Sequence, residues 1–397
     1  MTPLLIEHGY KTIHSATSQI ARSFWEKNPR EVYETIVLCA DSHDEIKSKN
    51  TIYSVKTSKF LKFGCKVLSK LGLRDFVYFP DTASIWALQS RKTAKKILKK
   101  HDVSYIHSIG KMFSSHLIAL WMKKRTGIKW IAQFNDPWME NNVTSNNRLV
   151  RFLHKRLEQS IAEHADVIIH NNAAIIKSWS SRYGSNIMRK VELLPLTYNI
   201  SHLPQINDHK SNHQYVISHI GSCYGTRSPM PVIKAVENFI GKYPQYSNII
   251  VVNFVGLIHN EAREYIKSHN LSFIHLYDIA APDEIMHFYD ESNMFLAIDL
   301  NIKESMFFPS KLMTYYYYRK PILGISNRGS VLESELHESG HSNFTFNDIN
   351  GIEQYLENVI HFKTETLQNF NKEKWLEYTY ENVYCKYCEI VRKLINV

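Results

Sequence analysis

The sequence contains few of the residues that mark a specialised class of protein. Its 397 residues include only five cysteines, which are scattered too widely to form a disulfide framework. Fourteen glycines and twelve prolines are too few for a fibrous or low-complexity chain. No apolar run approaches the roughly 18 residues that a membrane-spanning helix requires. These absences predict a globular protein without a transmembrane segment.

The beginning of the sequence also lacks a secretion signal. MTPLLIEHGYK has neither the basic start nor the apolar core of a signal peptide, so we expect a cytoplasmic location. The chain is long enough for two domains of about 200 residues each. Hydrophobic residues make up 44% of it, which is sufficient to build a core in both domains.

Acidic residues are scarce only in the first half of the chain. Residues 1–200 hold 31 Lys and Arg against 16 Asp and Glu, a net charge of +15, whereas the remainder holds 17 against 22, a net charge of −5. The excess indicates either an anionic partner for the first half or solvated helix faces. An anionic partner could be a nucleic acid, a membrane surface or a phosphorylated acceptor.

Short apolar runs alternate with helical segments, which predicts an α/β fold with parallel sheets covered on both faces. In the first half we expect strands at 4–6, 36–38, 105–107, 130–132 and 167–169, and helices at 15–26, 84–100, 114–125 and 148–164. In the second half we expect strands at 215–220, 249–255, 273–276, 294–298 and 321–325, and helices at 229–241, 260–269, 282–290 and 310–318.

A polar stretch at 199–213 separates the two halves and is interpreted as a linker. We therefore expect one Rossmann-like domain at 1–200 and a second at 214–371, facing each other across a cleft. An amphipathic helix at 372–394 is long enough to run back, so residues 372–397 should return to the first domain. Ligands of such sheets bind at the carboxyl ends of the strands.

Several common signatures are missing or badly placed. The chain has no G-x-G-x-x-G, P-loop or G-x-S-x-G motif, which weakens dehydrogenase, NTPase and hydrolase hypotheses, and it has no D-x-D. His337-Glu-Ser-Gly-His341 matches the zinc pattern H-E-x-x-H, but its glycine and the strand-like residues that follow favour a loop. Cys385 and Cys388 form a C-x-x-C inside a helical run, where we expect two buried thiols. No metal site is predicted.

A glycine-containing loop follows the first strand of the second half. Gly221-Ser222-Cys-Tyr-Gly225-Thr-Arg227-Ser-Pro229 leads directly into a helix. Glycine lets the backbone approach a ligand closely, the helix start supplies free amides, and Arg227 adds a forked cation. The loop suits a diphosphate, although strand-to-helix turns with glycine are also common without a ligand.

A second loop, Phe308-Pro309-Ser310-Lys311, leads into the helix expected at 310–318, so that Ser310 and Lys311 lie at its start. Proline suits the first turn of a helix, but a lysine there is unfavourable for the helix dipole. The misfit suggests an anion held between Lys311 and the Gly221 loop. The alternative is an ordinary surface lysine.

A carboxylate ends one predicted strand of the first half. Phe134-Asn-Asp136-Pro137-Trp138 follows the strand at 130–132, so Asp136 should lie at the carboxyl edge of the sheet. It is a candidate acid–base residue there. The alternative is a simple Asp-Pro turn.

Together these features resemble the retaining GT-B glycosyltransferases that assemble bacterial capsule, O-antigen and related surface polysaccharides. The resemblance covers nearly the whole chain and depends on the order and spacing of several short motifs. In the first half these are Phe79-Pro-Asp81 with Trp86, Tyr105-Ile-His-Ser108 with Ser114-Ser-His116, Asp136-Pro-Trp138, and the segment from Ala165 to Asn172. In the second half they are Gly221-Ser222, Arg227-Ser-Pro229, Pro309-Ser-Lys311 and Lys320-Pro321.

The resemblance implies that the second domain binds a nucleotide-sugar donor and the first domain binds an acceptor, either a glycan or a lipid-linked oligosaccharide. Implied donor contacts are Gly221, Ser222, Arg227, Pro309, Ser310 and Lys311; implied acceptor contacts are His116, Asp136 and Trp138. Arg227 and Lys311 would neutralise the diphosphate leaving group, so that neither a metal nor another cofactor is needed, and Asp136 would be the third catalytic residue.

Two regions depart from the family pattern. Related enzymes carry two glutamates spaced E-x7-E, the second of which grips the donor ribose. That second position is Thr314 here, and the first is Met306, with Glu304 two residues earlier. Thr314 and Glu304 are therefore candidate donor contacts, and the identity of the donor stays open. The amino terminus also lacks the usual glycine-rich loop.

Two other functions stay open. A nucleotide-sugar 2-epimerase has the same two-domain shape and would need several acid–base carboxylates and histidines. A non-enzymatic nucleic-acid binder would need aromatic residues among its basic ones, which the basic segments 95–100 and 123–125 lack.

A basic segment of the first half also suggests membrane contact. In residues 59–70, four lysines lie among Phe60, Phe63, Val67 and Leu68, which recur at roughly helical spacing. Such a helix either binds an anionic membrane surface peripherally, at the inner face of the cytoplasmic membrane, or packs on its own domain.

Overall fold

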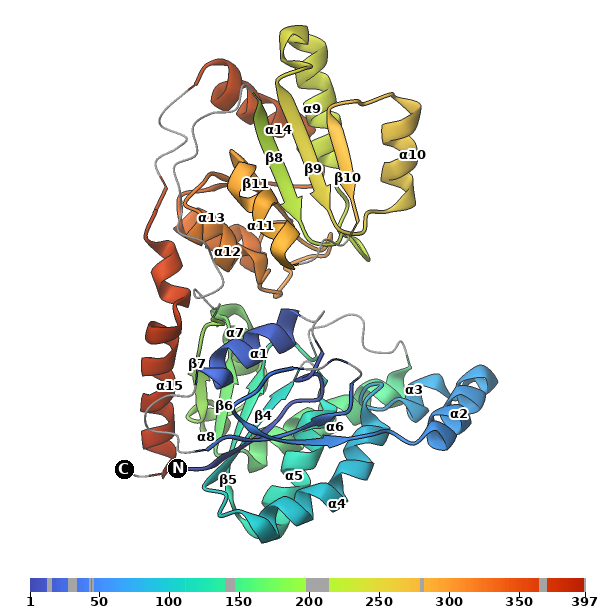
Figure 1. The fold of residues 1–397 in the computed structure, drawn as a ribbon, viewed down its shortest axis with the longest axis vertical. Coiled ribbons are helices and arrows are strands. Elements are labelled where there is room, and N and C mark those ends of the chain that lie inside the picture. Colours follow the sequence, from blue (N-terminus) through green and yellow to red (C-terminus); the bar gives the residue numbers. More distant parts are fainter. Residues whose placement is uncertain are drawn as a thin grey trace. The chain divides into compact units, whose positions relative to one another are not determined.

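The computed structural model describes residues 1–12, 16–27, 34–42, 44, 46–110, 112–139, 147–197, 214–278, 282–363 and 370–395. They form two compact units, the first from Met1–Asn199 with Thr379–Val397 and the second from Ile200–Tyr378. Each unit has its own parallel sheet with helices on both faces (Figure 1). The predicted linker at 199–213 lies outside the described residues.

The described part of the first unit contains a seven-stranded parallel sheet in the order β3-β2-β1-β4-β5-β6-β7. The strands are β1 (Pro3–Ile6), β2 (Ile36–Ala40), β3 (Thr51–Val55), β4 (Tyr105–Gly110), β5 (Lys129–Phe134), β6 (Val167–His170) and β7 (Val191–Leu193). The five predicted strands are confirmed. The two edge strands, β3 and β7, were not predicted.

The helices of the first unit alternate with these strands. They are α1 (Ala16–Glu26), α2 (Lys59–Leu68), α3 (Arg74–Val77), α4 (Ser84–Lys100), α5 (Ser114–Thr126), α6 (Arg148–His164), α7 (Ala173–Arg182) and α8 (Ser185–Met188), with the distorted turn η1 (Ser69–Leu73) between α2 and α3. Gly72 allows that turn because its φ of +82° is in the left-handed region. None of the described helices is both long enough and apolar enough to cross a membrane.

The C-terminal helix α15 (Tyr380–Ile395) belongs to the first unit, as predicted. It buries Val383, Ile390 and Leu394 against the same core as α1 and one face of the sheet. The Tyr387 hydroxyl lies within hydrogen-bond distance of both the Tyr105 hydroxyl, at 2.9 Å, and His107 Nδ1, at 3.0 Å. A helix far along the chain thereby completes the first core.

The predicted start of that helix at residue 372 is wrong. Residues Lys374–Tyr378 form a separate 3-10 turn, η6, and α15 begins only at Tyr380. The Thr379 hydroxyl accepts a hydrogen bond from the Asn382 N–H, which caps the new helix. Periodicity alone does not show this break, because the apolar residues continue through it.

The described part of the second unit contains a six-stranded parallel sheet in the order β10-β9-β8-β11-β12-β13. The strands are β8 (Tyr215–Ile220), β9 (Ile250–Val255), β10 (Ile274–Tyr277), β11 (Met294–Ile298), β12 (Ile322–Ile325) and β13 (Ser342–Phe344). Its helices and turns are α9 (Met230–Lys242), η3 (Pro244–Tyr246), α10 (Asn260–Ser268), α11 (Pro282–Glu291), α12 (Lys311–Tyr317), α13 (Val331–Glu338), α14 (Ile349–Leu356), η4 (Glu357–His361) and η6.

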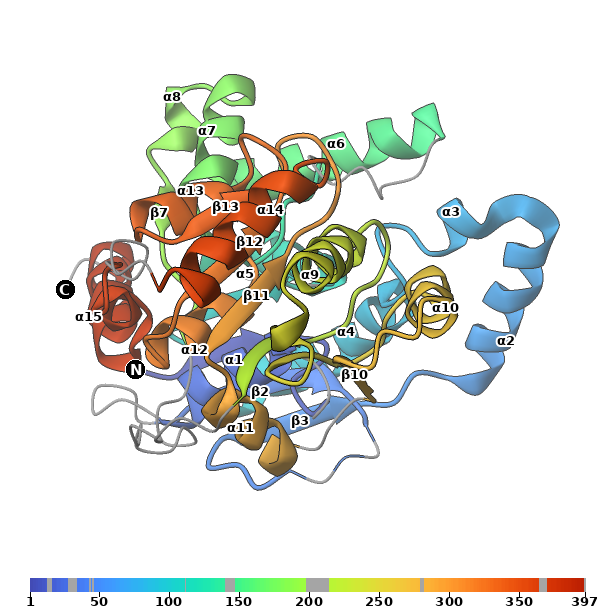
Figure 2. The same cartoon turned by 90° about the horizontal axis from the view of Figure 1, so that it is seen from above.

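The core of the second unit lies mainly between its sheet and α9, α10 and α14. Alternate residues of a strand point to opposite faces, so Val252 and Phe254 both face these helices. Helices α9 and α14 lie side by side on the sheet (Figures 1 and 2). Helices α11, α12 and α13 contact β8, β11 and β12, respectively.

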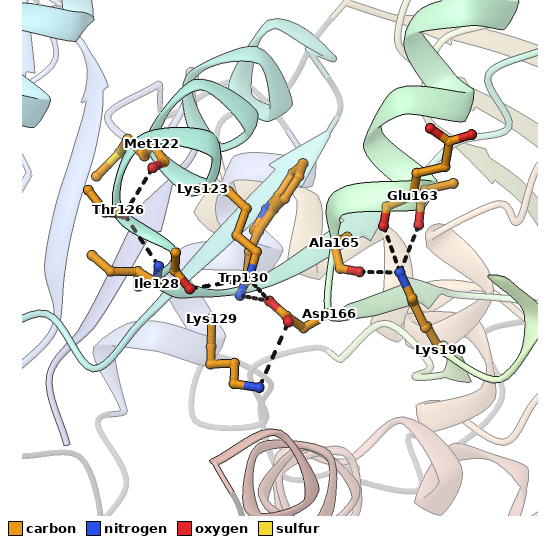
Figure 3. A network of polar contacts seen from close by, with 12 residues as sticks. Met122, Lys123, Thr126, Ile128, Lys129, Trp130, Glu163, Ala165, Asp166 and Lys190 are labelled. Carbon is orange, nitrogen blue, oxygen red and sulfur yellow. Dashed lines mark hydrogen bonds and ion pairs between the residues drawn. The ribbon is translucent and has the colours of Figure 1, made fainter. Parts of the chain in front are cut away.

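Some lysines of the first unit interact with a carboxylate of the same unit and thereby stabilise the fold. The Asp166 carboxylate accepts hydrogen bonds from Lys123 Nζ at 2.6 Å and from the Trp130 backbone N–H at 2.8 Å (Figure 3). Lys129 Nζ lies 3.9 Å from the same carboxylate. This cluster joins the start of β6 to α5 and β5, so these lysines contribute to the fold.

Lys190 stabilises the end of α6. Its Nζ donates to the carbonyl oxygens of Glu163 at 2.8 Å and Ala165 at 3.0 Å (Figure 3), where the helix dipole favours a cation.

We expect Lys190→Met to lower the free energy of unfolding by about 1–2 kcal/mol, since both carbonyls lose a charged donor. Urea denaturation measures this change. Lys177→Met, at an exposed position of α7, is the control, and an equal effect of both variants would contradict the assignment.

Candidate active site

The second sheet has a topological switch point between β8 and β11. The chain moves from β8 to β9 and β10 on one side, and β11, β12 and β13 lie on the other. Ligands of open α/β sheets bind outside the carboxyl ends of the strands at such a point. The two loops singled out from the sequence, after β8 and after β11, both begin here.

The neighbouring strands β8 and β11 separate toward their carboxyl ends. Their ladder pairs only Met294 with Ile217 and Phe295 with Ser218. Beyond these pairs, the Tyr315 hydroxyl of α12 accepts from the Ile220 N–H at 3.0 Å and donates to the Leu296 carbonyl at 3.3 Å. A side chain thus replaces the missing ladder, and the strands remain joined.

Lys311 lies beside this junction, at the first residue of α12. Its Nζ donates to His219 Nε2 at 3.0 Å, while His219 Nδ1 donates to the Leu296 carbonyl at 2.9 Å. Burial and the nearby Lys311 cation hold the pKa of His219 well below its usual value, so the ring is neutral and can accept. The histidine therefore orients the lysine without neutralising its charge.

The charge on Lys311 is itself destabilised. Burial lowers its pKa to about 7; Cys223 opposes this shift, and Arg227 reinforces it. Among the described residues, no carboxylate forms a salt bridge with this ammonium group, so binding of an anionic ligand would restore its charge. Strongly shifted pKa values of this kind are frequent at functional sites.

Gly221 leaves room for this lysine. Its φ is +128°, which favours glycine, and a Cβ at this position would lie 2.9 Å from Lys311 Nζ. Gly256, after β9, supports the loop from behind, since a Cβ there would lie 2.9 Å from the Gly221 carbonyl carbon. The ammonium group of Lys311 therefore occupies the space that a side chain at position 221 would fill.

Arg227 is held at the other end of the same loop. Its guanidinium lies over the Tyr224 ring, 4.6 Å from the centroid, and its carbonyl accepts from His259 Nε2 at 3.1 Å. Both Arg227 and Lys311 lower the pKa of the buried Cys223 thiol, against a larger effect of burial. The two predicted cations are therefore both close enough to Cys223 to affect the pKa of its thiol.

The other predicted residues of the second unit lie around this pair. The Ser222 hydroxyl accepts from the Leu257 N–H at 3.1 Å, and the Pro309 carbonyl accepts from the Leu312 N–H at 2.9 Å. Ser310 occupies the cap position of α12 without a side-chain capping bond. Each loop is thus stabilised by ordinary turn hydrogen bonds in addition to carrying a cation.

Glu304 and Thr314 differ in their surroundings. Glu304 is exposed, with φ of +50°, and its side chain packs near Gly329, which has φ of +76°. Burial raises the pKa of the Tyr289 phenol on α11 to about 12, and the side chain of Thr314 opposes this shift, so the two side chains lie close together. Thr314 thus lies beside Tyr289 within the unit, whereas Glu304 lies on the exposed β11–α12 loop.

Sequence reasoning missed two buried polar residues of the site. One is His219, and the other is Asp299, which directly follows β11 and whose Oδ1 accepts from the Leu300 N–H at 2.7 Å. Burial raises the pKa of Asp299, while the Leu300 N–H, Ser305 and Arg227 lower it in part. Both residues lie at or next to the carboxyl end of an apolar strand. A polar residue at such a position is the sequence feature from which both could have been predicted.

The acceptor-side residues of the first unit lie in different environments. Trp138 is buried, stacked on Phe113 at 4.0 Å and hydrogen-bonded to His154. His116 is also buried, and its Nδ1 contacts the Ser108 hydroxyl at 2.8 Å. Both rings are thus part of the core, and Asp136, partly exposed just after β5, is the acceptor-side candidate that we retain.

The two metal-like motifs have ordinary structural roles. Helix α13 continues through His337, so only the second half of that motif is a loop, and the partly buried His341 Nδ1 accepts from the Ile322 N–H. Cys385 and Cys388 lie on α15 as predicted, but Cys385 is exposed rather than buried because it faces away from the core. Across the described ranges, no group of three or more His, Cys, Asp or Glu could hold a metal ion.

No family model matches the sequence, and no relative is found among curated proteins. Solved structures do share the fold. A glycosyltransferase from Rickettsia africae has a TM-score of 0.70 at 11% identity, over 99% of this chain and 98% of that one. Anabaena HepE, solved with UDP-glucose, has 0.63 at 9% identity over 100% of both chains. A protein from Listeria monocytogenes assigned as a UDP-N-acetylglucosamine 2-epimerase has 0.64 at 10% identity, over 99% and 96%.

These similarities establish the fold. Both units have the doubly wound parallel sheet of a Rossmann-like domain, and the C-terminal helix completes the first unit. The chain therefore has a GT-B-like fold, as predicted from the sequence.

Proposed function

We propose that this chain is a glycosyltransferase that moves a sugar from a nucleotide-sugar donor to a glycan or lipid-linked acceptor in surface-polysaccharide synthesis. The observation that carries the proposal is the Lys311 ammonium group, held against Gly221 and near Arg227 at the switch point of the second sheet. Such a site suits the diphosphate of a nucleotide-sugar. The Anabaena structure of the same fold, solved with UDP-glucose, supports this class of donor.

The proposed reaction needs charge stabilisation more than a covalent catalyst. The bond between the anomeric carbon and the diphosphate oxygen breaks as an acceptor hydroxyl oxygen bonds to that carbon. Lys311 and Arg227 would stabilise the negative charge that develops on the leaving diphosphate. The acceptor proton would pass to Asp136 or to the departing phosphate, and we expect the anomeric configuration to be retained, as in the family that the sequence resembles.

Turnover should not require a divalent metal. Two protein cations in contact with the leaving group would perform the charge neutralisation that a metal performs in other transferases. We therefore expect an unchanged rate of nucleotide release after EDTA treatment. Loss of turnover in EDTA that manganese or magnesium restores would contradict this expectation.

Donor affinity should depend on pH near neutrality. The pKa of Lys311 is about 7 in the free protein, and a bound diphosphate should raise it, so binding takes up a proton. Above pH 7 the affinity for a nucleotide-sugar should then fall, approaching about tenfold per pH unit while the bound form stays protonated. Calorimetric titrations from pH 6 to pH 9, in buffers of different ionisation enthalpy, measure both effects. Affinity that is constant over this range would contradict the assignment.

A 2-epimerase is the second candidate, because the Listeria monocytogenes structure has the same fold. The two reactions differ in their need for an acceptor. A transferase releases nucleotide in proportion to glycosylated acceptor, whereas an epimerase converts the nucleotide-sugar alone. After thermal-shift screening of UDP-, GDP-, ADP- and CMP-sugars, the stabilising donor should be assayed with and without acceptor lipid. Acceptor-independent inversion at the sugar C2 would overturn the transferase proposal.

A further inference from the structure

Residues 59–77, which comprise α2, η1 and α3, form an arm that projects from the first unit. Figures 1 and 2 both show α2 and α3 extending away from the sheet, between β3 and α4. None of the residues in these three elements is buried. The apolar face that the sequence predicts for 59–70 therefore does not pack on the described part of its own domain.

The arm exposes an unusual amount of apolar surface. Phe60 is 82% exposed, Leu71 70% and Phe63 67%. Five further apolar side chains of the arm are exposed, namely Leu61, Val67, Leu68, Leu73 and Phe76. Single exposed apolar residues are ordinary, but eight within one short segment mark an interaction surface.

The charges of the arm indicate which partner this surface fits. Lys59, Lys62, Lys66, Lys70 and Arg74 lie among the apolar residues, and in the described part of the chain none of them forms a salt bridge. Lysine is depleted in protein–protein interfaces, where its charge must be desolvated. At a bilayer surface, lysine remains hydrated and meets anionic headgroups while apolar neighbours enter the acyl boundary.

A cavity of about 520 Å³ lies where the arm meets the body of the unit. Lys62 and Lys66 of α2 line one side, and His8, Tyr78 and Trp86 are among the residues that line the rest. Burial and the nearby Lys62 lower the pKa of His8 to about 4, so its ring is neutral at pH 7. The Trp86 indole N–H is buried and finds no acceptor among the described residues. The charge of the cavity wall therefore comes from the two lysines.

We propose that the arm docks the protein on a bilayer containing anionic phospholipid, with a headgroup phosphate held at the cavity by Lys62 and Lys66. Helix α2 joins the two parts of this surface, because the lysines of the cavity and the exposed Phe60 and Phe63 belong to it. Docking needs no glycosyl transfer, so its test is independent of the proposed reaction.

Co-sedimentation of the full chain with phosphatidylglycerol-containing vesicles, and with phosphatidylcholine vesicles, tests this docking. We expect binding that needs the anionic lipid and weakens at high salt. Phe60→Ser with Phe63→Ser should reduce binding by about tenfold or more, because both rings leave the acyl boundary. Leu88→Ser, at a 59% exposed position of α4, should not change it.

Two double variants distinguish a phosphate site at the cavity from attraction to the overall positive charge of the arm. Lys62→Ala with Lys66→Ala should weaken binding more than Lys59→Ala with Lys70→Ala, although both pairs remove the same charge from the arm. Equal loss in the two pairs would overturn the headgroup site. Equal binding to neutral vesicles would overturn the docking surface. So would a concentration-dependent dimer that the phenylalanine variants abolish, observed by ultracentrifugation without any vesicle binding.

Discussion

Replacing Lys311 with alanine should lower kcat/KM by about 100-fold, the usual loss when one group that stabilises transition-state charge is removed. The ammonium group fills the space beside Gly221, lies close enough to Arg227 to respond to its charge, and is oriented by His219. Without this group, the charge on the departing diphosphate would be stabilised by one protein cation instead of two. Steady-state kinetics with saturating acceptor measure the loss, and wild-type turnover in this variant would contradict the assignment.

Loss of activity in this variant should not come from unfolding. Burial lowers the pKa of Lys311 from an ordinary value of 10.5 to about 7, so between these values only the unfolded chain keeps the proton. Wild-type stability should therefore rise as the pH increases from 7 toward 10, and Lys311→Ala should remove this dependence. Lys267→Ala, at an exposed position of α10 in the same unit, is the matched control and should affect neither turnover nor the pH dependence of stability.

Asp136→Asn should lower turnover with the natural acceptor by about 100- to 10,000-fold, the range for loss of a general base. Its turn is well anchored on both sides. Trp138 stacks on Phe113, and the carbonyl of Asn135 accepts from Asn171 Nδ2 at 2.7 Å. A carboxylate on so rigid a turn can be positioned for an acceptor hydroxyl.

The matched substitution Asp166→Asn distinguishes catalysis from stability. Asp166 binds Lys123 inside the first unit, so its loss should lower the free energy of unfolding and leave turnover of the folded protein nearly unchanged. Asp136→Asn should show the opposite pattern. Near-normal turnover in Asp136→Asn would mean that the residue only forms the turn.

Much of the fold could be predicted because its central strands are continuous buried runs. β8 and β11 have the bounds expected from the sequence, and each is almost entirely buried. β3 was missed because it is an edge strand whose residues, Thr51–Val55, are half-buried or exposed and so carry no strong apolar signal. β7 has only three residues, too few for a pattern to emerge.

The site could be predicted only as two separate loops. Strand order brings Lys311 next to the Gly221 loop, and this proximity was expected from the sequence. His219, however, lies 92 residues from Lys311 in sequence, and their hydrogen bond depends on tertiary packing. Thr314 stays a predicted donor contact, and its proximity to Tyr289 of α11 follows from the packing of α11 beside α12, which also brings the Tyr289 and Tyr315 rings together. Which face of a helix a neighbour covers does not follow from local sequence.

The position of the donor diphosphate tests the central claim most directly. A crystal structure with the stabilising nucleotide-sugar, or with its nucleoside diphosphate, should place phosphate oxygens about 2.7–3.2 Å from Lys311 Nζ and against the Gly221 loop. Arg227 should approach the same diphosphate. A nucleotide bound elsewhere, with Lys311 still hydrogen-bonded only to His219, would contradict the proposed site and the charge-stabilised transfer that depends on it.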